Sequence, residues 1–101
     1  MAKVSMIVKN QKRIKLVEKL EVKRSKLKNL ISKKDADLMS KLEAVMKLSK
    51  LPRNSSKTRV RNRCEITGRP RGYYRKFKVC RTVLRKMFGF GLISGMVKSS
   101  W

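Results

Sequence analysis

The fold is decided by residues 64–83, CEITGRPRGYYRKFKVCRTV, which hold both cysteines of the chain. Two residues separate Cys64 from Thr67, twelve separate Thr67 from Cys80, and two separate Cys80 from Val83. Four cysteines at these positions would have the spacing of a structural zinc site, which needs four good donors. Valine has no lone pair, and the chain has no histidine to replace it. The spacing therefore predicts a metal-free vestige of a zinc knuckle, with two ordinary buried cysteines as the alternative.

Positive charge dominates the composition of the 101 residues. Lys and Arg total 29 and Asp and Glu total 6, which gives a net charge of +23. Such a charge favours a polyanionic partner, with nucleic acid ahead of an anionic membrane. An enzyme is disfavoured because there is no histidine to serve as an acid or base near neutral pH, and no cofactor is expected. The length supports one small domain with a thin core.

Residues 1–50 are predicted to be a helical N-terminal extension, because their apolar residues recur at helical spacing. The first helix is expected over about residues 4–31, a turn near 32–35 with Ser32 and Asp35 as the helix-start signal, and a second helix to about residue 50, ended by Pro52. The first helix should pack with Leu16, Leu20, Leu27, Leu30 and Ile31, a stripe interrupted by Lys23, and the second with Leu38, Leu42, Val45 and Met46. The individual lysines of these helices are predicted to be solvated side chains on an ordinary helical hairpin.

Residues 51–101 carry nine arginines, five lysines and one acid. Arginine offers phosphates and base edges a planar fork, so this half is predicted to be the nucleic-acid-binding module. Arg59, Arg61 and Arg63 alternate with other residues and would face one side of an extended segment, as along a phosphate backbone. A solvated loop is the alternative. A short helix is predicted over about 80–88.

Residues 67–78, TGRPRGYYRKFK, interleave cations with Tyr73, Tyr74 and Phe77. Cations neutralise phosphates and flat rings stack on unpaired bases, a combination that favours structured RNA, although the pattern does not by itself choose RNA over DNA. Alternatively, the rings fill the small core, and at least one of them is expected to do so. The chain is thus predicted to be mainly α and elongated, with two N-terminal helices, an extended arginine-rich segment, and a degenerate, metal-free, zinc-knuckle-like C-terminal module with a short helix.

Several segments together resemble the family of the fourteenth protein of the small ribosomal subunit, in its longer, zinc-free bacterial or organellar form. They are LPRNSS, RNRC, TGRPRGYYRKF and the closing VKSSW. The resemblance implies a structural, non-catalytic component of the subunit head that helps its assembly, with small-subunit RNA and neighbouring head proteins as partners. It also implies a ribosomal location, either organellar, with mitochondria ahead of plastids, or in the bacterial cytoplasm. Two positions depart from the family pattern, Lys78 in place of glycine and Ser94 in place of proline.

The resemblance, with the cation and ring pattern, gives a set of predicted RNA-binding residues. They are Arg53, Asn54, Ser55, Arg59, Arg61, Arg63, Arg69, Arg71, Tyr73, Arg75, Lys76, Arg81, Arg85, Lys98 and Trp101. Two rival functions are a free nucleic-acid-binding module, which would fold stably alone, and a membrane-active helix over residues 1–31. The second needs an apolar face with aromatic residues, which this stretch lacks.

Overall fold

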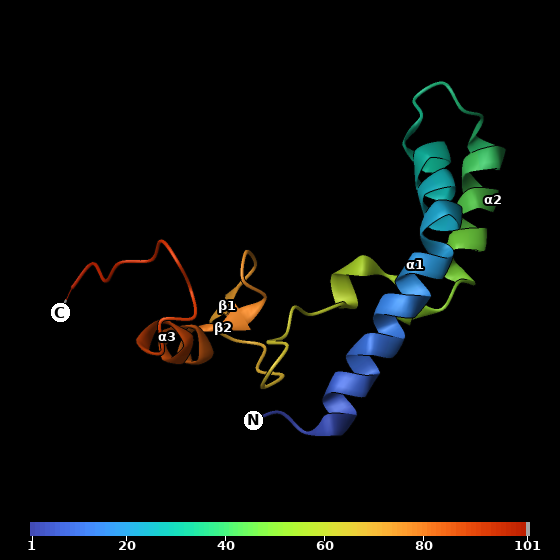
Figure 1. Cartoon of the computed structure of the whole chain (residues 1–101). Helices are drawn as coiled ribbons and strands as arrows, with labels where there is room; N and C mark the ends of the chain where they lie inside the picture. The colour runs from blue at the N-terminus through green and yellow to red at the C-terminus, as the bar shows by residue number, and fades with distance from the viewer. Residues whose placement is uncertain (101) are drawn as a thin grey trace. The chain divides into compact units, whose positions relative to one another are not determined.

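The computed structural model describes residues 1–100 and divides the chain into two compact units. One, here called the cysteine unit, contains Met1–Ile7 and the chain from Arg61 onward; the other, the helical unit, is Val8–Val60. The elements in order are α1 (Val4–Ser32), α2 (Leu38–Ser49), two 3₁₀ turns (Arg53–Ser55 and Lys57–Arg59), β1 (Tyr73–Tyr74), β2 (Val79–Cys80) and α3 (Arg81–Gly89) (Figure 1). The mainly helical architecture is confirmed. None of the described helices is both long and apolar enough to cross a membrane.

The first two helices lie where the sequence predicts them, but the start of α2 differs. The Ser32 hydroxyl donates a hydrogen bond of 3.2 Å to the Asn29 carbonyl, so this serine belongs to the last turn of α1. Asp37 has a non-helical backbone conformation and is the cap of α2, which begins at Leu38. The helix-start signal at Ser32 and Asp35 was therefore wrong, because a serine can also bond a carbonyl one turn earlier.

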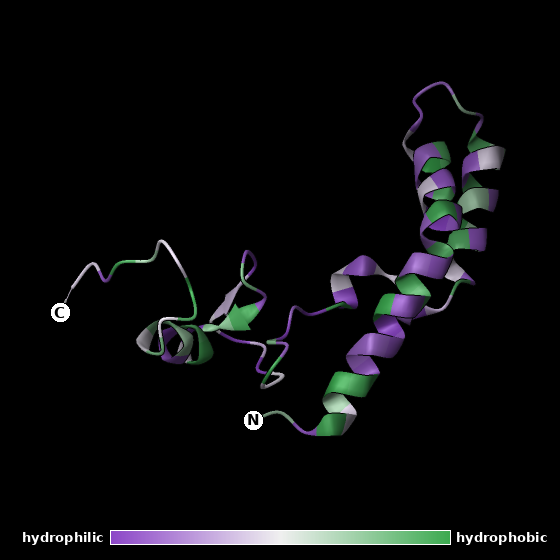
Figure 2. Ribbon diagram, in the orientation of Figure 1, coloured by the Kyte–Doolittle hydropathy of each residue, from purple (hydrophilic) through white to green (hydrophobic). Residues whose placement is uncertain are grey.

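The packing face of α2 also differs from the prediction. Leu38, Leu42, Val45 and Met46 are all exposed, with Leu38 at 69%, whereas Ala44 is 3% exposed. The helix is apolar on more than one side (Figure 2), so its apolar pattern alone does not select the buried face. The buried side of α2 is therefore the one that carries Ala44, away from the larger apolar side chains.

The inward stripe of α1 is nearly as predicted. Leu16, Leu20, Leu27 and Ile31 are half-buried, while Leu30 is exposed. Half-buried Arg24 lies in this stripe, and its guanidinium donates a hydrogen bond of 2.9 Å to the hydroxyl of Ser55. The aliphatic stem of an arginine can be covered while its charged end finds a polar partner.

The segment predicted to be extended is instead folded into two 3₁₀ turns as far as Arg59. The Ser55 N–H bonds the Pro52 carbonyl at 3.0 Å, and the Arg59 N–H bonds the Ser56 carbonyl at 3.1 Å. Serine and asparagine favour such local bonds over an extended chain. The chain becomes extended at Val60, so Arg59 does not continue the alternation of Arg61 and Arg63.

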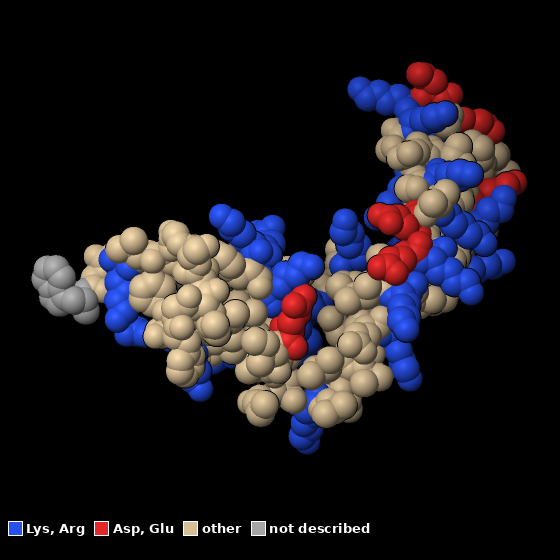
Figure 3. Space-filling model, viewed as in Figure 1, with Lys and Arg blue, Asp and Glu red and all other residues tan. Residues whose placement is uncertain are grey.

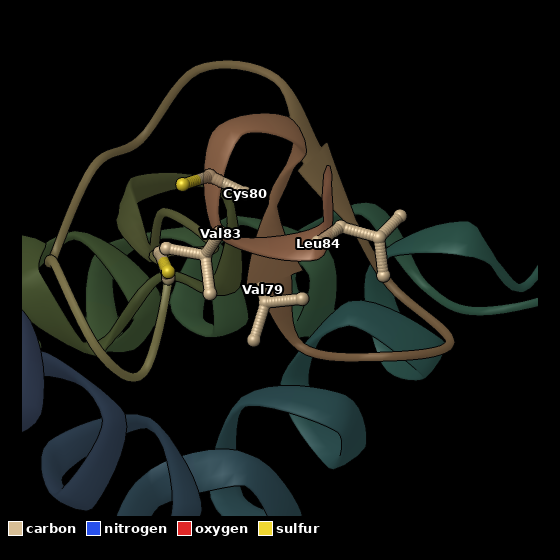
Figure 4. Packing of buried hydrophobic residues seen from close by; sticks show 5 residues of the cluster. Val79, Cys80, Val83 and Leu84 are labelled. Carbon is tan, nitrogen blue, oxygen red and sulfur yellow. The ribbon is translucent and has the colours of Figure 1, made fainter. Parts of the chain in front are cut away.

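The cysteine unit is organised by a small antiparallel hairpin that the sequence did not reveal. Tyr73 pairs with Cys80 and Tyr74 with Val79 in strands of two residues each, which are too short for an alternating pattern. The chain passes from β2 directly into α3, close to the predicted helix at 80–88. The core of the unit consists of five buried residues, Cys64, Val79, Cys80, Val83 and Leu84 (Figure 4).

The first residues of the chain pack on the turn that follows Cys64. The Ala2 N–H donates a hydrogen bond of 3.2 Å to the Thr67 carbonyl. Buried Gly68 has φ +70°, and a Cβ built on it would lie 2.7 Å from the Ile7 side chain. Gly68 is therefore required both for its backbone conformation and for the approach of Ile7.

We expect Gly68→Ala to destabilise the cysteine unit by more than about 2 kcal/mol, because a positive φ and overpacking both penalise a methyl group. Gly91→Ala is the matched control, since Gly91 has φ +68° but no atom near its Cβ position, and it should cost only about 1 kcal/mol. Amide hydrogen exchange of residues 64–70 in the folded chain measures the difference. Equal exchange in the two variants would contradict the packing role of Ile7.

Lys78, one of the two departures from the family pattern, has φ +54° in the tight turn between β1 and β2. We expect Lys78→Gly to stabilise this hairpin by up to about 1 kcal/mol, because glycine adopts this conformation without the steric cost. The lost ion pair with Glu65 is 4.0 Å long and exposed, and should contribute little.

The matched control is Lys76→Gly, which removes the same charge from the same turn where φ is not positive. It should destabilise the hairpin. Exchange of the Glu65 amide, which donates to the Lys78 carbonyl at 3.1 Å, reports on both variants. Faster exchange in Lys78→Gly would show that the turn is not strained.

Candidate nucleic-acid interface

The cysteine unit presents many cations and one carboxylate. The exposed cations among the predicted binding residues are Arg61, Arg69, Arg71, Arg75, Lys76, Arg81, Arg85 and Lys98. The carboxylate belongs to Glu65, which pairs with Lys78. The other acids of the chain lie in the helical unit (Figure 3). The cysteine unit therefore has little internal neutralisation and is suited to a polyanion.

The turn from Cys64 to Gly72 fixes two of these arginines. The Cys64 N–H donates to the Arg69 carbonyl at 3.0 Å, and the Gly68 N–H donates to the Cys64 carbonyl at 2.8 Å. Gly68 and Gly72 both have positive φ, which bends the backbone at each end of Arg69-Pro70-Arg71. The exposed side chains of Arg69 and Arg71 thus stand on a turn whose backbone is held internally.

Arg63 is the exception among the arginines of this unit. Its side chain is half-buried and donates a hydrogen bond of 2.9 Å to the Gly68 carbonyl. The Nε atom of Arg63 is also buried, with no hydrogen-bond partner in the described part of the chain. Arg63 therefore holds the turn, and it does not form an outward row with Arg61.

The three rings of the segment 67–78 divide between core and surface. Phe77 packs against the buried cluster, as expected for at least one ring, and the Lys76 ammonium lies 5.8 Å from its ring centre. Tyr73 is half-buried opposite Cys80, and Tyr74, which follows it in β1, is 49% exposed. The ring with the larger exposed surface is thus Tyr74, which the predicted binding set left out in favour of Tyr73. The strand alternation would have identified it, had the strand been recognised.

The 3₁₀ turns of the helical unit contain the remaining predicted residues. Arg53 and Asn54 are exposed, and the Asn54 side-chain oxygen accepts a hydrogen bond of 2.9 Å from Arg59. Ser55 is only 1% exposed, and its hydroxyl donates to the Pro52 carbonyl while accepting from Arg24. Its side chain is therefore internal, which the sequence could not show because Arg24 lies 31 residues away.

The two thiols of the core are unusually acidic. The Thr82 hydroxyl, 3.1 Å from the Cys80 sulfur, and the Val83 N–H lower the pKa of Cys80 to about 6. Burial raises the pKa of Cys64, but hydrogen bonds from Thr67, Cys80 and Ile66 together outweigh it and leave that pKa below its usual range. The Thr67 hydroxyl also lies 3.6 Å from the Cys80 sulfur. The described residues contain no group of three or more Cys, His, Asp or Glu side chains arranged to hold a metal ion.

The predicted residues beyond α3 are only partly described. Lys98 is exposed, and it borders the same cavity as Arg81 and Arg85. Trp101 lies outside the described residues. Besides Tyr74, sequence reasoning missed Arg24, because a single arginine within a lysine-rich helix gives no signal.

Comparison with known proteins gives one family and close relatives. The family described as "Ribosomal protein S14p/S29e" matches residues 47–100. "Small ribosomal subunit protein uS14" of Orientia tsutsugamushi (strain Ikeda) is 59% identical over 101 residues, which is the whole of both chains. The proteins of the same name from Wolbachia pipientis wMel and Brucella ovis are 56% and 50% identical, again over the full length of both chains.

We expect Arg24→Ala to loosen the first 3₁₀ turn, because the buried Ser55 hydroxyl loses a charged donor worth about 1.5–3 kcal/mol. Exchange of the Ser55 and Ser56 amides should become about tenfold faster or more in particles that contain the variant. Lys26→Ala is the control, since Lys26 is an exposed cation of the same helix. If both variants exchange alike, the hydrogen bond does not support the turn.

Proposed function

The chain belongs to the S14p/S29e family of ribosomal proteins, and from that premise we propose how its residues serve the small subunit. It is a structural component of the small ribosomal subunit that binds its RNA, and it is not an enzyme. Its partners are ribosomal RNA and other ribosomal proteins. The particular contacts below are our proposal.

The observation that carries the proposal is the row of exposed cations on the internally fixed turn and hairpin of the cysteine unit. Arg69, Arg71, Arg75 and Lys76 follow one another along this backbone, and the one acidic residue of the unit, Glu65, pairs instead with Lys78. They replace the counterions of crowded phosphates and so allow RNA helices to approach one another. Arg61, Arg81, Arg85 and Lys98 extend these contacts, and Arg53 with Asn54 makes a second group in the helical unit.

Two predicted residues receive a different role. Arg63 and Ser55 act as positioning residues, since their polar atoms bond the Gly68 carbonyl and Arg24. Residues 51–101 remain our proposed RNA-binding module, with residues 1–50 as the helical extension. Tyr73 and Trp101 are retained as proposed contacts.

The exposed apolar face of α2 favours a protein neighbour. Leu38, Met39, Leu42, Val45 and Met46 share this face, and all are exposed. An apolar patch on a small chain is typical of a protein interface, whereas phosphates would require cations there. We propose that a neighbouring protein of the subunit head covers it.

Cys64, Thr67, Cys80 and Val83 are proposed to be a knuckle that closes on packing and needs no metal. Three of the four lie in the buried cluster, and the fourth, Thr67, places its hydroxyl against a core sulfur. A donor set with a threonine and a valine does not fit tetrahedral zinc. Free thiols that are held by hydrogen bonds serve here as small core residues.

The proposed location is a bacterial-type ribosome, either in bacterial cytoplasm or in an organelle. The relatives compared above come from bacteria. The lysine-rich first half is typical of an AT-rich genome, as in an organelle or a reduced bacterium.

Replacing Arg61 or Arg71 with alanine should weaken subunit assembly. Each change removes a charge-assisted phosphate contact, so retention of the chain on the subunit should weaken roughly tenfold. The measurement is the fraction of chain retained on purified small subunits through washes of rising salt. Lys47→Ala removes the same charge from α2, where Lys47 pairs with Glu43, and should leave retention unchanged. Normal retention of both arginine variants would refute this assignment.

Cys64→Ser and Cys80→Ser should leave the metal content of the small subunit unchanged. Zinc per particle, measured by mass spectrometry of the elements, is compared between particles with the parent chain and with each variant. One fewer zinc per particle in either variant would contradict the packing-closed knuckle.

A further inference from the structure

We propose that a cavity of the cysteine unit binds one unpaired nucleotide that is extruded from the small-subunit RNA. The cavity has a volume of about 660 Å³ and lies between α3, β1 and the chain beyond Gly95. This volume is typical of small-molecule sites, which span about 300–1,000 Å³. The inference rests on the proposed function. It also gives a role to the aromatic and apolar residues of the cavity, which phosphate binding alone does not explain.

Part of the cavity lining is cationic. Arg81 and Arg85 lie one helical turn apart on α3, and Lys98 comes from the chain after the helix. All three side chains are exposed, and no carboxylate is among the described residues that line the cavity. Three cations around one opening are suited to the phosphate of a nucleotide.

Another part of the lining is apolar and partly aromatic. Leu84 and Phe88 of α3 and Met96 line it, and Tyr74 contributes its exposed ring from β1. Leu84 belongs to the buried cluster and Met96 packs against it, so this wall is continuous with the core. Proteins hold extruded bases between aromatic and apolar side chains, because every base has a flat face that can stack.

The position of Arg81 is fixed before any ligand arrives. Its N–H donates a hydrogen bond of 2.7 Å to the Gly72 carbonyl. A Cβ built on Gly72 would lie 3.4 Å from both Cγ and Cδ of Arg81, so the arginine stem rests on the bare glycine backbone. The hairpin thus fixes Arg81 and also contributes Tyr74 to the cavity lining. A site that is preorganised in this way loses less entropy when a ligand binds.

A nucleotide can occupy the whole lining, with its phosphate at the cations and its base against the aromatic and apolar residues. Inorganic phosphate or an acidic peptide would satisfy the three cations but would leave the aromatic wall empty. An apolar peptide would leave the three cations without partners. Among the partners of a small-subunit protein, an unpaired nucleotide of the RNA provides both a charge and a flat ring.

The test places a photo-crosslinking side chain in the cavity of assembled small subunits. Tyr74→p-benzoylphenylalanine should crosslink, on irradiation, to a single unpaired nucleotide, which is mapped by reverse transcription. Phe90→p-benzoylphenylalanine is the control, because Phe90 is highly exposed in the same unit but does not line the cavity. It should not crosslink to that nucleotide. Crosslinks from Tyr74 to a protein, or spread over paired nucleotides, would overturn the proposal.

A second measurement keeps the parent tyrosine. Arg85→Ala should raise the reactivity of the crosslinked nucleotide toward a base-modifying reagent about tenfold, because a held base becomes free. Lys86→Ala, the neighbouring exposed cation of α3 that does not line the cavity, should not. Unchanged reactivity of that nucleotide in Arg85→Ala would overturn the proposal.

The chain content of the particles is measured in the same samples. Particles that contain the chain but give no crosslink to an unpaired nucleotide would refute the cavity proposal alone. A chain that is absent from the particles would refute the proposed function as well.

Discussion

The burial of Cys80 is the constraint on which the cysteine unit depends. This residue is 0% exposed, ends β2 opposite Tyr73 and immediately precedes α3. Its sulfur lies near the hydroxyls of both Thr67 and Thr82. One side chain thus joins the turn, the hairpin and the helix, so the cations on these three elements keep fixed positions relative to one another.

That small core has to oppose a large electrostatic repulsion. The half of the chain beyond residue 50 carries fourteen cations and one acid, while the core holds five buried residues. Unneutralised charge destabilises a compact state, and a small core provides only modest stabilisation in return. RNA phosphates remove the repulsion, so folding of the cysteine unit and binding of its partner are expected to reinforce each other.

The sequence predicted what local patterns encode. The periodicity of α1 and the apolar face of α3 placed both helices within a residue or two of their observed ends. The zinc-like spacing of the cysteines stays a prediction, and the structure shows the Thr67 hydroxyl 3.6 Å from the Cys80 sulfur. The family pattern has glycine where this chain has Lys78. The positive φ of Lys78 explains that glycine, because glycine adopts this conformation without steric cost.

What the sequence could not predict depends on contacts between distant segments. The buried face of α2 carries Ala44, although the larger apolar residues of that helix suggested another face. The inward role of Ser55 depends on Arg24, and that of Gly68 depends on Ile7. The strands β1 and β2 were missed because two residues are too few for a periodic signal. In each case tertiary packing overrides or completes a local preference.

The central claim is that this chain acts as an RNA-bound component of the small ribosomal subunit. The most direct measurement is sedimentation of a native lysate on a sucrose gradient, with and without ribonuclease, with the chain followed by mass spectrometry. The account predicts that the chain migrates with the small subunit and leaves that fraction when the RNA is digested. A chain that stays at the top of the gradient in both samples would contradict the account.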